Sequence, residues 1–436
     1  MTLRTTPLLL MVVTAVIAVK AQQEQQMTVN ELFELVESNS KTLQSQKISV
    51  EFAQKGIEVA RTARLPEVNA SASVSLNGDV LVTDRDFTHW EGYGAPRWGN
   101  SLAIEAQQIV YAGGAIEAGI RLAELQAEQA AVSVSQSRQQ QRFLALGQYM
   151  DIFKLRNREQ VFVQNIELTQ RLIADIQAKY EQGMALKNDV TRYELQLETL
   201  RLQLKKLQDQ RAILNHQLVN QLGLPNGTII IPDEGVINQT YSNDGEGIWQ
   251  DLSVTESPTM RQVTLSKQMA EQELRIARSD KLPKVALVAA DNFSGPFTYG
   301  IPPLNKNINY WYLGIGVKYS ISSLFKSGKK IEQAMVRARQ ADQNREVATE
   351  HLNNQVQQAY TYYQQAYVEL DTQRKSVELA RQNYQVINDR YLSQLALVTD
   401  MIDASNVKLN AELNEVDARV GIAWAYYRLR YVAGIL

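Results

Sequence analysis

The second half of the chain repeats the first, and this duplication constrains the fold more than any other feature. Residues 60–68 return as residues 277–285, an offset of 217 (277 − 60). Residues 180–189 return as residues 391–400, an offset of 211 (391 − 180). Two landmarks at nearly constant offset predict one structural unit of roughly two hundred residues that occurs twice.

The two units divide the chain. We expect a first structural repeat at residues 22–224, a linker at residues 225–250 and a second repeat at residues 251–436. Residues 1–21 combine a positive start at Arg4, an apolar run and a small-residue cleavage site. This pattern is typical of a secretory signal peptide, which is excluded from the fold.

Composition excludes several classes of function. Cysteine is absent, so we expect neither disulfides nor a lipid anchor after the cleavage site. The three histidines lie far apart, which argues against a zinc or iron site. A net charge of −2 argues against a nucleic-acid partner. No phosphate loop or nucleophile elbow is present, so we expect no cofactor and no enzyme.

Each unit contains a long segment with the pattern of a coiled coil. Residues 114–180 and 328–391 contain no proline, and helices of this length extend roughly 100 Å. Apolar residues recur at steps of four and three, interrupted in the second unit only at Gln373. We therefore predict two long antiparallel helical hairpins, with turns near residues 182–189 and 393–400.

Two pairs of predicted strands flank the start of these helices. One strand, residues 68–76, and another, residues 313–321, alternate strictly between apolar and polar side chains. Residues 102–111 and 285–297 are their weaker partners. We expect Gly113-Gly114 and Ser327-Gly328 to end the second strand of each pair.

Such strands fit an ordinary soluble β-layer or a transmembrane barrel. The signal peptide, the duplication and the long helices favour the barrel, in which one face of each strand meets lipid. Four strands cannot close a barrel, so several copies must contribute. The predicted lipid-facing residues are Val68, Ala70, Ala72, Val74, Leu313, Ile315 and Val317.

On these features the chain resembles the TolC family of outer-membrane factors. The resemblance covers the whole mature chain and rests on the duplicated plan, on Leu65-Pro66 and Leu282-Pro283, and on the two turns. It implies an α+β membrane protein: a homotrimer with a twelve-stranded barrel in the outer membrane and a periplasmic helical tunnel. Its implied partners are a periplasmic adaptor and an inner-membrane RND or ABC transporter.

The resemblance also implies functional residues in the second turn. Asp400 and Asp403 match aspartates that form rings at the narrow tunnel entrance of the family. Such rings favour cations over anions. The alternative is that Asp400 is a helix N-cap and that Asp403 is an acidic residue of the first turn.

A second set matches residues that hold the family's coiled coils shut. Tyr391 and Asp189 match a clasping pair, and Tyr180 and Gly183 lie in the corresponding first turn. Alternatively, Tyr391 is only the last residue of the helical seam. Ala396 stands where the family has a gating arginine. The sequence therefore does not show whether the closed state is held shut in the same way as in the family.

A structural protein is the alternative to a channel. A periplasmic coiled-coil scaffold or adaptor also needs long helices, but it has no need for two strand pairs with aromatic loops. The sequence does not identify the exported cargo.

Overall fold

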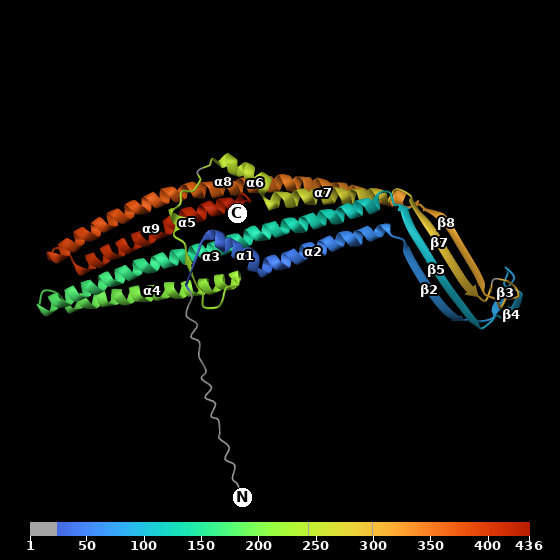
Figure 1. The fold of residues 1–436 in the computed structure, drawn as a ribbon, viewed down its shortest axis with the longest axis horizontal. Helices are drawn as coiled ribbons and strands as arrows, with labels where there is room; N and C mark the ends of the chain where they lie inside the picture. The colour runs from blue at the N-terminus through green and yellow to red at the C-terminus, as the bar shows by residue number, and fades with distance from the viewer. Residues whose placement is uncertain (1–23, 243, 299) are drawn as a thin grey trace, which may run out of the picture.

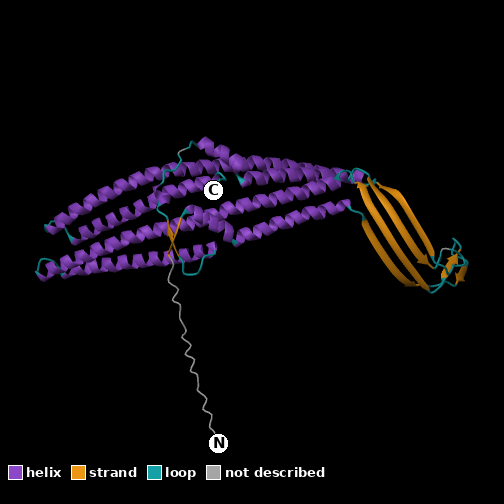
Figure 2. Ribbon diagram, in the orientation of Figure 1, coloured by secondary structure: helices purple, strands orange, loops and turns teal. Residues whose placement is uncertain are grey.

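The computed structural model describes residues 24–242, 244–298 and 300–436. Its helices lie side by side in a long bundle, and a curved β-sheet extends from one end of this bundle (Figure 1; Figure 2). The predicted signal peptide at residues 1–21 lies outside the described residues.

Each repeat builds one long helix with two shorter helices packed along it. The helices are α2 (Lys41–Arg61), α3 (Ala115–Glu181) and α4 (Lys187–Leu222) in the first repeat, and α7 (Pro258–Ser279), α8 (Ser323–Leu392) and α9 (Val398–Val432) in the second. With 67 and 70 residues, α3 and α8 extend about 100 Å. The predicted hairpins are confirmed, and the turns lie at residues 182–186 and 393–397.

The predicted coiled-coil seam of α8 is buried in the structure. Its buried members are Leu352, Val356, Ala359, Tyr363, Ala366, Leu370, Val377 and Ala380. The seam of α3 behaves differently at its end, because Ile176 is buried whereas Tyr180 is exposed. Its counterpart in the second repeat, Tyr391, packs against the apolar cluster at the tip. The two repeats therefore share a backbone plan but not the same packing.

One antiparallel sheet joins the two repeats in the order β2-β5-β7-β8. Its strands are β2 (Glu67–Leu76), β5 (Trp98–Tyr111), β7 (Lys284–Gly295) and β8 (Ile308–Lys318). Each repeat supplies two neighbouring strands, and β5 pairs with β7 across the repeats. At the far end a small hairpin, β3 (Val80–Thr83) with β4 (Trp90–Tyr93), contains the aromatic residues Trp90 and Tyr93 of the expected loop.

The register places most of the large apolar side chains of the four strands on one face, which we call the apolar face. Directly opposite residues share a face, and Val68 lies opposite Ala106, Ala106 opposite Ala289, and Ala289 opposite Leu313. All seven predicted lipid-facing residues lie on this face. The other side, the polar face, carries residues such as Asn69, Ser71, Ser73, Glu105 and Asn292.

The predicted start of the second long helix is wrong. Strand β8 already ends at Lys318 and α8 begins at Ser323, so Ser327-Gly328 is helical and Ile321 is not in a strand. Backbone bonds from Ser323 and Leu324 back to residues 320 and 321 start the helix. Gly328 fits because one glycine costs only about 1 kcal/mol in a helix that packing stabilises elsewhere. The first repeat follows the prediction, since α3 begins directly after Gly113-Gly114.

The segment expected as a linker has structure of its own. It contains β6 (Ile229–Pro232), α5 (Gly235–Asn238) and the start of α6 (Glu246–Glu256). Strand β6 pairs in parallel with β1 (Glu24–Met27), which leads into α1 (Val29–Asn39). These elements pack around the middle of the helical bundle (Figure 1). Four-residue strands that pair across some two hundred residues leave no local pattern from which to predict them.

The largest core lies at this middle level. It joins the centres of α3 and α8 with the ends of α4 and α9 through 32 buried residues, among them Tyr149 and Tyr363. The hydroxyl of Tyr149 donates to the carbonyl of Met27 at 2.7 Å and accepts from the N–H of Asp233 at 2.8 Å. A smaller cluster of five buried residues lies at the tips. The bundle is therefore held most firmly at its middle.

Candidate functional site at the helical tips

The two hairpin turns have the same backbone. Helix α3 ends with Gly183 in the left-handed conformation at φ +74°, and α8 ends with Gln394 at φ +63°. In each turn an N–H returns to a carbonyl five residues earlier: Met184 to Lys179 and Leu395 to Arg390, both at 2.8 Å. The offset of 211 residues therefore describes true structural equivalence, with Gly183 matched by Gln394 (394 − 183 = 211).

The role of Gly183 in the first turn can be tested by substitution. Gly183→Ala should destabilise the first tip locally by about 1 kcal/mol, because alanine disfavours the left-handed conformation, although no atom obstructs the added Cβ. Hydrogen exchange at the amide of Met184 should accelerate. In the control Gly119→Ala, the added Cβ also meets open space, but within α3, and this change should stabilise the helix. Equal effects of both variants would contradict our account of the turn.

The interpretation of Asp400 as an N-cap is wrong. Leu397 occupies the N-cap of α9, and Asp400 is the third helical residue, whose carboxylate accepts the N–H of Leu397 at 2.9 Å. Asp189 makes the same bond to the N–H of Leu186 at 3.2 Å in the first repeat. The extended backbone of Leu397 directs its N–H towards the first turn, and a carboxylate there also interacts favourably with the helix dipole.

The second repeat presents two exposed carboxylates at its tip. Asp400 and Asp403 are both exposed, and Asp403 makes no ion pair with any described residue. The first-repeat residue equivalent to Asp403 is Arg192 (403 − 211 = 192), so the first tip has one carboxylate and one guanidinium instead. Sequence reasoning missed Arg192, although the repeat offset was sufficient to find it.

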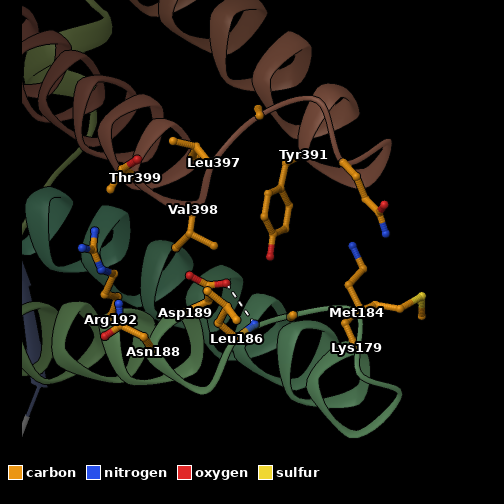
Figure 3. Close-up of a pocket in the computed structure, with 13 residues that line it drawn as sticks. Lys179, Met184, Leu186, Asn188, Asp189, Arg192, Tyr391, Leu397, Val398 and Thr399 are labelled. Atoms are coloured by element: carbon orange, nitrogen blue, oxygen red, sulfur yellow. Dashed lines mark hydrogen bonds between the residues drawn. The ribbon is translucent and has the colours of Figure 1, made fainter.

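A groove of about 420 Å³ separates the two tips. Figure 3 shows Tyr391 reaching across it from the second repeat towards Asp189, Leu186 and Lys179 of the first. The amino group of Lys179 lies 4.9 Å from the centre of the Tyr391 ring, a cation–π contact between the repeats. No pattern in the sequence singles out Lys179.

The structure brings the predicted clasp residues Tyr391 and Asp189 to the same groove, but their contact is indirect. No hydrogen bond joins them among the described residues, since the carboxylate of Asp189 accepts from Leu186. Burial, and then the negative charge of Asp189, raise the pKa of Tyr391. The phenol therefore stays protonated and available as a donor. Tyr180 lies on the exposed side of α3, outside this groove.

Beneath the groove the tips share an apolar cluster. Tyr193, Val190 and Ile176 of the first repeat pack against Val398 and Met401 of the second. Burial also raises the pKa of Tyr193, whose hydroxyl has no hydrogen-bond partner in the described structure. An unpaired buried hydroxyl is costly, so this small cluster holds the tips together weakly.

No helix in the described part of the chain is long and apolar enough to cross a membrane. The family profile of outer membrane efflux proteins matches residues 32–224 and 249–434, which together cover most of the chain. The chain belongs to the outer membrane efflux protein family. The resemblance stated above is thereby confirmed. The chain is an outer-membrane efflux protein, and the family function of transport agrees with the expectation of a channel.

Solved structures of outer-membrane proteins share this fold. The outer membrane protein VceC from Vibrio cholerae has a TM-score of 0.75 at 15% identity, over 93% of this chain and 96% of its own. The CmeC outer membrane channel of Campylobacter jejuni has a TM-score of 0.74 at 14% identity, over 93% and 85%. The transmembrane channel CusC gives 0.77 at 13%, over 93% and 92%. No curated protein sequence matches significantly.

Proposed function

We propose that three copies of this efflux protein form a passive exit duct, with a twelve-stranded barrel in the outer membrane and a helical tunnel in the periplasm that is gated at its tips. One observation carries this proposal: the four-stranded sheet is apolar on one face and polar on the other, and it is open at both edges. Within the part of the protomer that the structure describes, strands β2 and β8 each have one unpaired edge.

The apolar face is too large to meet water. Leu313, Ile315 and Val317 of β8 are 74%, 72% and 66% exposed, and Val74 and Trp311 are similarly uncovered. Exposed apolar patches of this kind mark membrane or protein contacts. Strands of 10 to 14 residues match the thickness of a bilayer when tilted. In hydrocarbon the open edges need partners, which a second and a third copy provide.

The family and the shape of the tips support the proposal of two partner proteins. Outer membrane efflux proteins act as the outer component of export assemblies, and we propose that the tips of this chain meet a periplasmic adaptor and an inner-membrane transporter. The groove between the repeats, with Tyr391 across it, is the proposed clasp. Asp400 and Asp403 are the proposed aperture, because they are the exposed carboxylates of the second turn. A scaffold that never enters a membrane does not account for the apolar face.

The proposal predicts a trimer. Mass measurement of the protein purified in detergent should give three copies, since four strands per copy do not close a barrel and about eight is the smallest closed form. The band should migrate differently on a gel before and after heating. A stably folded monomer in detergent would contradict the closed barrel and would favour the scaffold.

A further inference from the structure

A lysine-lined cavity lies where the sheet meets the long helix α8. It has a volume of about 440 Å³ and includes Lys284 of β7, Lys318 of β8, and Lys326 and Lys330 of α8. Asp280 also lines it and pairs with Lys330 at 2.5 Å. The other three lysines make no ion pair within the described residues. The cavity therefore has an excess of three positive charges.

The strand register makes this arrangement unfavourable without an anion. Lys284 and Lys318 lie directly opposite each other on β7 and β8. Like charges at directly opposite positions destabilise a sheet. Both lysines lie on the polar face, because Val285 and Val317, which pair one position along, belong to the apolar face. The cavity thus opens on the face that we propose lines the duct.

A serine hydroxyl in the same cavity makes no hydrogen bond to a described residue. Ser327 of α8 lines the cavity and is only 6% exposed. Its hydroxyl makes no hydrogen bond to any residue that the structure describes and remains accessible from the cavity. The N–H groups at the start of α8 bond back to residues 320–322 and are not free for a ligand. The site therefore consists of the lysines and Ser327.

In the proposed trimer we expect a neighbouring copy to neutralise the cavity only in part. In a closed barrel β8 lies beside β2 of the next copy, and β2 begins at Glu67 just after Arg61 and Arg64. These arginines pair with Glu124 and Glu117 of their own copy. Glu67 is then the one carboxylate that β2 brings without an arginine partner, which leaves an excess of positive charge.

We propose that this cavity binds a small multivalent anion with phosphate or carboxylate groups that passes through the duct. Rings of lysine favour anions in pores, and the threefold assembly repeats the site three times. This inference rests on the proposed function, because it takes the polar face as the wall of the duct. A protein gated by aspartates at its tips would then hold anions at its junction with the barrel.

Inorganic pyrophosphate, titrated calorimetrically into the detergent-purified trimer at constant ionic strength, tests this site. Wild type should bind, and Lys318→Gln with Lys326→Gln should weaken binding about tenfold, since each exposed charge contributes modestly. Lys329→Gln is the matched control, because Lys329 pairs with Glu332 on the same helix and does not line the cavity. It should bind like wild type.

The other outcomes overturn the inference. No binding, or equal weakening in Lys329→Gln, excludes a specific site. Binding that appears only in Glu67→Gln shows that the neighbouring copy fills the cavity. An anionic phospholipid that co-purifies with wild type and is lost from the double variant, without pyrophosphate binding, assigns the cavity to a headgroup. The mass of the same sample shows whether the protein is a trimer. A loss of binding in an intact trimer contradicts this inference alone, whereas a monomer contradicts the proposed function.

Discussion

Ile315→Arg is expected to abolish assembly in the outer membrane, whereas Gly314→Arg, one position earlier in the same strand, is expected to be tolerated. An arginine on the lipid face near the bilayer midplane costs roughly 2–4 kcal/mol. Three copies raise this cost to about 6–12 kcal/mol per trimer, which is comparable to the whole stability of a typical domain at about 5–15 kcal/mol. Val317→Arg should behave like Ile315→Arg.

The control variant introduces the same arginine on the other face of the strand. Gly314 lies on the polar face, and a Cβ added there meets no atom within 4 Å. Replacing Gly316 or Lys318 by a polar residue should likewise preserve assembly. Outer-membrane fractionation with heat-modifiable gel migration measures the outcome. If arginine is equally harmful at both positions, our assignment of the lipid face to β8 is wrong.

Asp400→Asn combined with Asp403→Asn is expected to remove the cation selectivity of the closed duct and its block by divalent cations. Six carboxylates meet at one constriction if both side chains face the threefold axis, and neighbouring carboxylates share a divalent ion. Asparagine retains an oxygen that accepts the N–H of Leu397, so helix stability should change by only a few tenths of a kcal/mol.

Single-channel recording in planar bilayers measures this effect. Asp175→Asn with Glu194→Gln is the matched control, because it removes two exposed carboxylates near the same end of the first repeat. The control should keep the selectivity and the periplasmic block. If the double aspartate variant conducts and is blocked like wild type, Asp400 serves only to accept the N–H of Leu397 and does not form part of the aperture.

The long helices and the strand faces were predictable because their patterns are local and repeated. The four-three spacing from Leu352 to Ala380 extends over eight turns, and the alternation from Val68 to Val74 identifies one face directly. The register across β5 and β7 then joined both repeats into one sheet. That pairing was not visible in either strand alone.

The remaining features depend on distant or shared contacts. The strand pair β1 and β6 exists because the chain around Met27 and Asp233 meets Tyr149, which no sequence window contains. The start of α8 depends on the backbone hydrogen bond from Ser323 to Ser320. The prediction placed this start too late because it took Gly328 as the end of the strand. At the tips, Tyr180 and Tyr391 occupy equivalent positions in the sequence but differ in packing, because the groove lies on one side only.

Because the largest core lies at the middle of the bundle, a small rotation there produces a larger displacement at the tips. Helix α4, with 36 residues, extends about 54 Å from the middle core to the tip. A rotation of about 5° at the core would move its far end by about 5 Å over that length. A partner that shifts the packing at the middle slightly would therefore widen the aperture by several ångströms. The helices would act as levers, and the duct would open without any helix unfolding.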